Sequence, residues 1–407
     1  SLDAAAALLA EAKFPVILSG AGVVIGGAIP ECAALAEKLD APVCSGYQHN
    51  DSFPGSHPLA VGPLGYNGSK AAMELIAKAD VVLALGTRLN PFSTLPGYGL
   101  DYWPKTAKII QVDINADRIG LTKKVMVGIC GDARQVAQQI LEKLSPKAGD
   151  AGRTERKAVI HQTKSAWLQK LSSMDHEDDD PGTTWNEDAR KRDADRMSPR
   201  QAWRAIQAGL PANATISSDI GNNCAIGNAY PTFEEGRKYL APGLFGPCGY
   251  GLPSIIGAKI GKPEVPVFGF SGDGAFGISI NEMTSICRDE WPAITMIIFR
   301  NYQWGAEKRN SILWYDNNFV GTELDPKLSY AKIAEACGFK GVTVRTQSET
   351  TAALKKAAED QAKGVTTFIE IILNQELGEP FRRDAMKKPV AIAGISKSDM
   401  RLQKGAA

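Results

Sequence analysis

Residues 265–276 read VPVFGFSGDGAF, and their apolar run stops abruptly at Gly272-Asp273-Gly274. An apolar run without alternation is typical of a strand buried on both faces of a parallel sheet. The glycines let the backbone approach a phosphate closely, and a helix expected to begin near Asn281 would offer it free N–H groups. Because a carboxylate repels phosphate, Asp273 requires a cation between them, and Mg²⁺ commonly bridges such a pair.

The next apolar run, AITMIIF at 293–299, supplies a candidate partner for Asp273. It ends in Arg300-Asn301, and Asn301 follows Asp273 by 28 residues, which is room for one helix and one strand. Neighbouring strands would bring both residues to the carboxyl edge of the sheet, where open α/β sheets bind ligands. A carboxylate, an amide oxygen and a backbone carbonyl of the Tyr302-Gln303 loop could join phosphate oxygens and water in an octahedron. The predicted metal ligands are therefore Asp273, Asn301 and Gln303.

Residues 198–390 repeat this alternation of strands and helices, which predicts one α/β domain. A further strand end, Asp219-Ile220-Gly221-Asn222-Asn223, adds polar groups at the same edge. Strands are predicted at 215–218, 265–270, 293–299 and 366–373, and helices at 200–210, 327–337 and 350–362.

Residues 1–145 show the same pattern, so the predicted fold class is α/β with two doubly wound parallel-sheet domains. The turn Gly20-Ala21-Gly22 follows a predicted strand, but Ile25 stands where a dinucleotide fingerprint has its third glycine, and we expect no nucleotide there. Strands are predicted at 14–19, 41–44, 80–85 and 108–112, and a helix at 29–39.

Residues 146–197 are polar, charged and punctuated by Pro and Gly, which indicates a linker that contains a helix near 158–171. The acidic run at 177–180 is expected to be a solvated surface rather than a metal site. The tail at 391–407 is expected to be loose.

The composition argues against several classes of function. The 407 residues include 46 Lys and Arg against 45 Asp and Glu, so nucleic acid is not a predicted partner. No run of about 18 apolar residues occurs, and no membrane partner is predicted. The seven cysteines are scattered, which favours reduced thiols in a cytoplasmic protein.

These motifs together resemble those of the thiamine diphosphate (ThDP) enzymes. The GDG sequence and Asn301 resemble the family's diphosphate-binding motif, in which two adjacent asparagines are usual; here the first is Arg300. GPCGYGLP at 246–253 resembles the stretch that holds the aminopyrimidine ring, with Cys248 where the family often has a bulky apolar residue. Residues 1–145 resemble the central domain of the acetolactate synthase and pyruvate oxidase group.

The resemblance implies two cofactors, ThDP and Mg²⁺. Carried onto this sequence, it predicts the following cofactor-binding residues: Gly221, Asn222, Asn223, Gly246, Cys248, Gly272, Asp273, Gly274, Ala275, Asn301, Gln303 and Gly305.

A narrower resemblance lies in RNYQWGAEKR at 300–309, together with 218–228 and 174–177. These stretches are similar to those of family members that convert sulfoacetaldehyde and inorganic phosphate to acetyl phosphate and sulfite. Both substrates are anions, so Arg300, Lys308 and Arg309 are the predicted catalytic cations. Two alternatives stay open: another ThDP lyase or synthase, such as an acetolactate synthase, and a non-catalytic subunit with this fold.

The family also has a first domain, whose glutamate activates the cofactor. We expect this chain to begin at the central domain and to lack that pyrimidine-binding domain, which a missing N-terminal part or another subunit would supply. The chain alone would then hold half of each active site and be inactive. By resemblance, a homodimer or homotetramer is expected.

Overall fold

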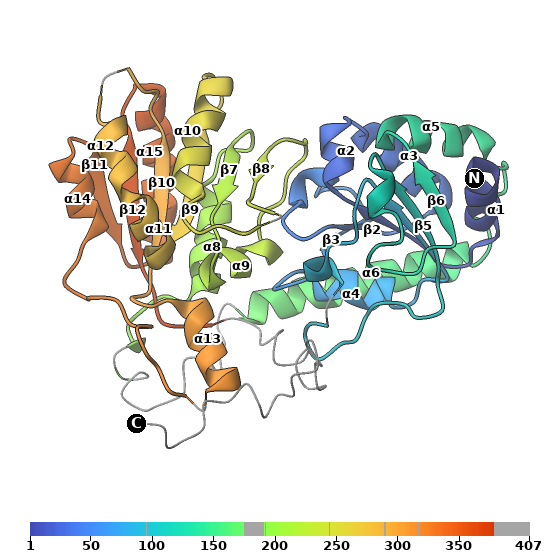
Figure 1. Ribbon diagram of the computed structural model, residues 1–407, viewed down its shortest axis with the longest axis horizontal. Coiled ribbons are helices and arrows are strands. Elements are labelled where there is room, and N and C mark those ends of the chain that lie inside the picture. Colours follow the sequence, from blue (N-terminus) through green and yellow to red (C-terminus); the bar gives the residue numbers. More distant parts are fainter. Residues whose placement is uncertain are drawn as a thin grey trace. The chain divides into compact units, whose positions relative to one another are not determined.

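The computed structural model describes residues 1–94, 96–174, 191, 193–243, 245–288, 290–315 and 317–377 (Figure 1). The chain forms two compact units. Unit 1 comprises Ser1–Met174 and Asn228–Gly243, and unit 2 comprises Asp175–Gly227 and Leu244–Ala407. The acidic run at 177–180 and the tail at 391–407 lie outside the described residues.

Unit 1 is built on a parallel sheet with the strand order β3-β2-β1-β4-β5-β6. The runs predicted as strands form β1, β2, β4 and β5, so these predictions are confirmed. Sequence analysis missed the two edge strands, which are short, and β6 alternates buried and exposed residues. The strand bounds are β1 Pro15–Ser19, β2 Val43–Ser45, β3 Ala60–Pro63, β4 Val81–Leu85, β5 Lys108–Asp113 and β6 Val127–Cys130.

Helices cover both faces of this sheet, as a doubly wound fold requires. Ile17 of β1 packs in a cluster with residues of α1, α3 and α5, whereas Val16 and Leu18 pack with residues of α4 and α6 on the opposite face. The helix bounds are α1 Leu2–Glu11, α2 Ala21–Ile25, α3 Ile29–Leu39, α4 Lys70–Ile76, α5 Ala133–Lys143 and α6 Arg153–Met174.

Part of the predicted linker is built into unit 1. The helix expected near 158–171 is confirmed as the central part of α6. Its Arg156 is buried and donates hydrogen bonds to the carbonyls of Lys13, Leu39 and Asp40, which ties the helix to two loops of the domain. Residues 153–174 therefore pack as a structural element of unit 1.

The segment Asn228–Gly243, which contains β8 (Tyr239–Leu240), also packs with unit 1. Asn50 Nδ2 donates to the carbonyls of Asn228 and Pro231, each at 2.9 Å. These long-range contacts explain why a segment from the middle of the second predicted domain groups with the first unit.

Unit 2 has a second parallel sheet, in which the strands pair in the order β11-β12-β10-β9-β7. The two α/β domains predicted from the sequence are thus confirmed as a fold class. The strand bounds are β7 Thr215–Ser218, β9 Val267–Gly272, β10 Thr295–Arg300, β11 Lys340–Val344 and β12 Thr367–Ile372. The helix bounds are α8 Pro199–Gly209, α9 Asn222–Ile226, α10 Gly251–Gly261, α11 Asp273–Ser279, α12 Met283–Ile286, α13 Gly305–Trp314, α14 Tyr330–Ala336 and α15 Gln347–Ala362.

The helix expected to begin near Asn281 is a wrong prediction. Strand β9 ends at Gly272 and α11 begins at Asp273, so no loop separates them. Gly272 is extended, with φ −70° and ψ 157°, and turns the chain directly into the helix. Asp273 is therefore held in a regular first turn rather than in an open loop.

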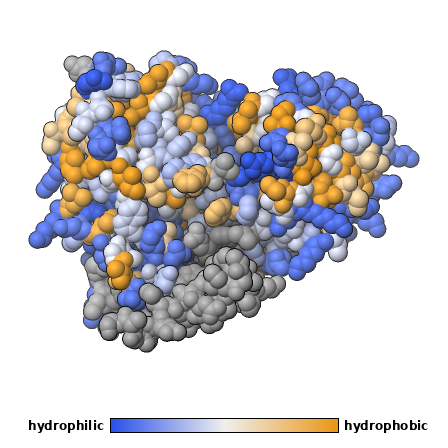
Figure 2. All heavy atoms as spheres, viewed as in Figure 1, coloured by the Kyte–Doolittle hydropathy of each residue, from blue (hydrophilic) through white to orange (hydrophobic). Residues whose placement is uncertain are grey.

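The surface carries no segment built to span a lipid bilayer: among the described helices, none combines sufficient length with sufficient apolar character. Figure 2 shows hydrophilic and hydrophobic residues interspersed on the face in view, in keeping with the balanced composition.

Candidate functional site

Three strand ends meet at the carboxyl edge of the unit 2 sheet. Strand β9 lies between β7 and β10, and its Gly272 is paired with Phe299 of β10. The residues that follow these strands, Asp219, Asp273 and Asn301, are therefore neighbours in the fold. This confirms the predicted order of strands on which the site depended.

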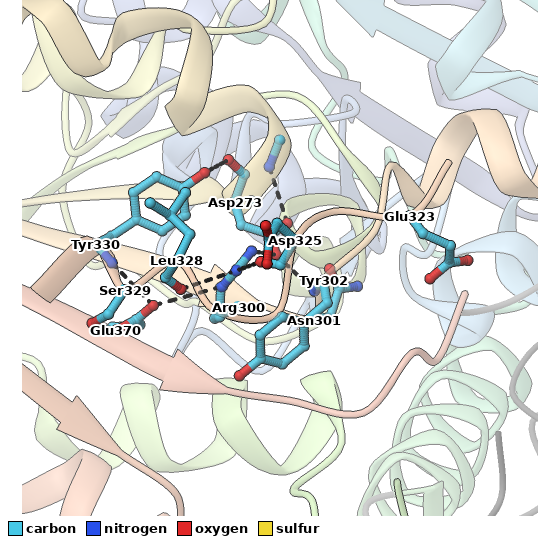
Figure 3. Close-up of polar contacts among 12 residues, drawn as sticks. Asp273, Arg300, Asn301, Tyr302, Glu323, Asp325, Leu328, Ser329, Tyr330 and Glu370 are labelled. Atoms are coloured by element: carbon cyan, nitrogen blue, oxygen red, sulfur yellow. Dashed lines mark hydrogen bonds and ion pairs between the residues drawn. The ribbon is translucent and has the colours of Figure 1, made fainter. Parts of the chain in front are cut away.

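Asp273 lies at the centre of a dense set of donors and is 1% exposed (Figure 3). Its Oδ2 accepts hydrogen bonds from the Tyr302 amide at 2.7 Å and from Arg300 Nη1 at 3.0 Å. Its Oδ1 accepts one from the Gly274 amide at 3.0 Å. Burial raises the pKa of Asp273 to about 6, and the positive charge of Arg300 opposes that rise.

Two buried amide oxygens accompany this carboxylate. Asn301 Nδ2 donates to Asn223 Oδ1 at 3.4 Å, and Gln303 Nε2 donates to the Gln375 carbonyl at 3.1 Å. The Oδ1 of Asn301 and the Oε1 of Gln303 accept no hydrogen bond from the described residues. A buried acceptor without a hydrogen bond raises the free energy of the folded protein, so a bound group that interacts with these oxygens would be stabilised. A hard cation such as Mg²⁺ is one such group.

Asn301 and Gln303 flank Tyr302, whose backbone is in the left-handed region at φ +61°. A bulky residue rarely adopts this conformation, and the Tyr302 amide is aimed at Asp273. Sequence patterns do not reveal such a strained position. The described residues contain no group of three His, Cys, Asp or Glu side chains suited to a metal, so the candidate cation site rests on one carboxylate and on amide oxygens.

Asp219 was noted in the sequence as the start of a polar strand end, but it was not among the predicted site residues. Its Oδ1 accepts from the amides of Ile220 at 2.8 Å and Gly249 at 3.0 Å, and its Oδ2 from the Gly251 amide at 2.9 Å and Ser271 Oγ at 3.1 Å. Burial raises its pKa, against the effect of these hydrogen bonds. The signal in the sequence that could have identified it is a carboxylate placed directly after a predicted strand.

The contacts of Asp219 hold the loop that contains Gly246 and Cys248 beside the strand ends. Cys248 is partly exposed, and burial raises the pKa of its thiol. The predicted cofactor-binding residues on this loop therefore lie at the same edge as Asp273.

The remaining predicted residues also gather at this edge. Gly221, at φ +139°, precedes α9, which carries Asn222 and Asn223. A Cβ on Gly305 would lie 3.2 Å from Asn222 Nδ2, so α13 begins against α9. A Cβ on Gly274 would lie 2.8 Å from the Trp304 ring, so Trp304 packs directly against the GDG turn.

The predicted cations are buried rather than open to solvent. Arg300 and Lys308 are each 0% exposed, and Arg309 is 5% exposed. Lys308 Nζ contacts Glu323 Oε1 and lies 3.0 Å from Gln375 Oε1. The structure therefore brings Arg300 to Asp273, whereas Lys308 pairs with Glu323 and with Gln375, whose carbonyl accepts from Gln303.

Two family models match the chain. The model described as "Thiamine pyrophosphate enzyme, central domain" matches residues 2–140, and the one described as "Thiamine pyrophosphate enzyme, C-terminal TPP binding domain" matches residues 219–371.

Similar proteins have names that agree with these matches. A "Probable sulfoacetaldehyde acetyltransferase" of Rhizobium meliloti (strain 1021) is 80% identical over 98% of this chain and 68% of its own length. A "Sulfoacetaldehyde acetyltransferase" of Roseovarius nubinhibens is 75% identical over 99% of this chain and 67% of its own length. A "Probable acetolactate synthase large subunit" of Methanocaldococcus jannaschii is 31% identical over 87% of this chain and 57% of its own length. The chain therefore belongs to the thiamine pyrophosphate (ThDP) enzyme family and, within it, to the sulfoacetaldehyde acetyltransferases.

Proposed function

We propose that this chain carries the diphosphate- and cation-binding part of an enzyme that converts sulfoacetaldehyde and inorganic phosphate to acetyl phosphate and sulfite. The observation that carries the proposal is the buried carboxylate of Asp273 at a strand end next to that of Asn301, whose buried amide oxygen accepts no hydrogen bond from the described residues. The substrates follow from the high identity to relatives named for sulfoacetaldehyde.

In this proposal Asp273 and Asn301 hold Mg²⁺ through their side chains and Gln303 holds it through its backbone carbonyl, since carboxylate and carbonyl oxygens are the ligands that it prefers. The cation would neutralise the diphosphate, which Asp273 alone would repel. Gly272 leaves open space where a side chain would stand, because a Cβ there would meet no atom within 4 Å. The diphosphate would approach the backbone at this point.

When bound, ThDP supplies a nucleophilic carbon for addition to the aldehyde carbonyl. The loop that Asp219 anchors, which includes Cys248, would hold the aminopyrimidine ring. Trp304 and Gly274, which are in close approach, would wall the diphosphate end of the site. These residues position the cofactor and exclude water from it.

The proposed anion-binding residues are Lys308 and Arg309. Glu323, whose side chain is 49% exposed, pairs with the buried Lys308, so an arriving sulfonate or phosphate would compete with an internal carboxylate for this cation. Both Nη atoms of Arg300 donate to groups of the protein itself, which favours an internal role over contact with substrate.

The test is an assay of the native protein, including the pyrimidine-binding domain expected to complete each active site, with ThDP, Mg²⁺, sulfoacetaldehyde and phosphate, in which both sulfite and acetyl phosphate are measured. We expect equal amounts of the two products and their loss in Asp273→Asn. The distant likeness to acetolactate synthases makes pyruvate the competing substrate. Acetolactate formed from pyruvate, without sulfite release, would overturn the proposal, and ThDP binding without either product would favour a non-catalytic subunit.

A further inference from the structure

Arg300 is a buried cation whose partners come from several parts of unit 2. Its guanidinium donates to Asp273 Oδ2, to the Asp325 carbonyl at 2.5 Å and to the Leu328 carbonyl at 3.1 Å (Figure 3). It lies over the rings of Tyr302 and Tyr330, at 4.2 Å and 5.3 Å from their centroids. A guanidinium held on all sides in this way keeps one orientation, because its planar fork is fixed by several partners at once.

Glu370 is the second carboxylate beside Arg300. It is 2% exposed on β12, and its Oε1 lies 3.7 Å from Arg300 Nε. It also accepts from Ser329 Oγ at 2.8 Å and from the Tyr330 amide at 3.2 Å. One guanidinium therefore lies beside two buried carboxylates, Asp273 and Glu370. Its single positive charge cannot neutralise both, so a second cation at Asp273 would be stabilised.

The hydrogen bonds of Asp273 leave room for that cation on one oxygen. A carboxylate accepts about four hydrogen bonds. Among the described residues, Oδ2 already accepts from Arg300 and Tyr302, whereas Oδ1 accepts only from Gly274. A divalent cation would therefore find its open position on Oδ1, and it could take Oδ2 as well only by displacing a donor.

We infer that Arg300 is a positioning residue that occupies Oδ2 of Asp273, enforces a one-oxygen contact with the divalent cation and so favours Mg²⁺ over Ca²⁺. This inference rests on the proposed function. Mg²⁺ demands near-octahedral geometry with few ligands, whereas Ca²⁺ accepts more ligands and tolerates a carboxylate that binds through both oxygens. A donor fixed on the second oxygen selects against the larger ion.

The experiment measures the Kd of ThDP by isothermal titration calorimetry, with the native protein, its pyrimidine-binding domain included, in excess Mg²⁺ or excess Ca²⁺. The quantity compared is the ratio of the Kd in Ca²⁺ to the Kd in Mg²⁺. We expect Arg300→Gln to lower this ratio about tenfold. The reason is that Oδ2 becomes available and Ca²⁺ gains a ligand. Loss of a residue that orients a metal ligand typically changes metal affinity by about 10- to 100-fold, and this estimate is the lower end of that range.

Removing Arg300 alone leaves two buried carboxylates without their shared cation, so Arg300→Gln is paired with the double variant Arg300→Gln/Glu370→Gln. We expect the double variant to fold more stably than the single one and to show the same lowered ratio. Glu370→Gln alone should weaken binding in both ions by a similar factor and keep the ratio, because Arg300 still holds Oδ2. If the double variant does not fold, Arg300→Lys takes its place, since an ammonium cannot serve Asp273 and both carbonyls together.

Arg345→Gln is the matched control, since Arg345 is an exposed arginine of the same unit, and it should change neither Kd nor ratio. An Arg300→Gln variant, single or double, that folds and binds ThDP with the ratio of the wild type would overturn the inference and leave the proposed function standing. A wild-type protein that binds no ThDP with either cation would overturn both.

Discussion

Asp219 and Gly251 are 32 residues apart in the chain, yet Asp219 Oδ2 accepts the Gly251 amide at 2.9 Å. The same oxygen accepts from Ser271 Oγ, which belongs to the strand that ends in the candidate cation site. Because α10 begins at Gly251, one buried carboxylate fixes the start of a helix, the loop before it and a neighbouring strand end. This arrangement joins the expected aminopyrimidine loop to the expected diphosphate site.

We predict that Asp219→Asn lowers the free energy of unfolding by about 1–3 kcal/mol, the range for buried donors left without an acceptor. An amide has one acceptor oxygen, and its NH₂ group would face N–H donors. ThDP binding should weaken as well, because the Gly246–Gly249 loop loses its anchor. Urea unfolding and ThDP titration measure the two effects. Glu264→Gln, at an exposed acidic residue of the same unit, is the control; unchanged ThDP affinity in Asp219→Asn would show that the loop is held by other contacts.

The two glycines of the GDG motif should respond differently to alanine. A Cβ on Gly274 would lie 2.8 Å from the Trp304 ring, whereas one on Gly272 would meet nothing within 4 Å. We expect Gly274→Ala to cost about 1–3 kcal/mol of stability through overpacking. Gly272→Ala should leave the stability of the free protein unchanged and weaken ThDP binding, because its methyl group enters the space kept for the diphosphate.

Thermal unfolding without ligand and ThDP titration separate these two effects. Equal loss of stability in both variants would mean that Gly272 serves the fold. Unchanged ThDP affinity in Gly272→Ala would remove the backbone at this glycine from the cofactor site.

The sheet cores could be predicted from sequence because their strands are buried on both faces. The apolar runs at 80–85 and 293–299 correspond to β4 and β10, in which every residue is buried. The edge strands β6 and β11 escaped prediction because they are only partly buried; Lys340–Val344 (β11) has a single fully buried residue. The segment Asn228–Gly243 also escaped, because its grouping with unit 1 depends on long-range hydrogen bonds.

The residues of the candidate site could be placed at one sheet edge because strand order and strand ends follow from the pattern. The pattern did not show which side chains at this edge are buried or with which groups they pair. Arg300 was predicted to face substrate, but it is buried between Asp273 and Glu370. Glu370 lies inside a predicted strand, where its pairing with an arginine 70 residues earlier has no local signal.

Acid should destabilise unit 1 through His49. Burial, assisted by the charge of Arg88, lowers the pKa of His49 to about 4 from its ordinary 6.5. Between these values the unfolded chain binds a proton that the folded protein does not bind, so stability falls as the pH drops from about 6.5 toward 4. We predict that His49→Gln flattens this part of the stability profile, measured by urea unfolding at several pH values.

His161→Gln, on an exposed position of α6, is the control and should keep the slope of the wild type. An identical slope in His49→Gln would mean that other groups carry the acid sensitivity of the unit.

Asn301→Ala should weaken cation-dependent ThDP binding much more than it lowers the stability of the fold. The side chain makes one long hydrogen bond, at 3.4 Å to Asn223, and its Oδ1 is a buried acceptor without a described partner. Removing it should therefore change the free energy of unfolding of the ligand-free protein by no more than about 1 kcal/mol. The Kd of ThDP in Mg²⁺ should rise by about tenfold or more, because a ligand oxygen is lost.

Two controls accompany this measurement. In EDTA the variant and the wild type should bind ThDP equally weakly, and Asn281→Ala, at an exposed asparagine, should match the wild type throughout. A fall in stability with no change in the Kd measured in Mg²⁺ would place Asn301 in the fold and outside the cation site.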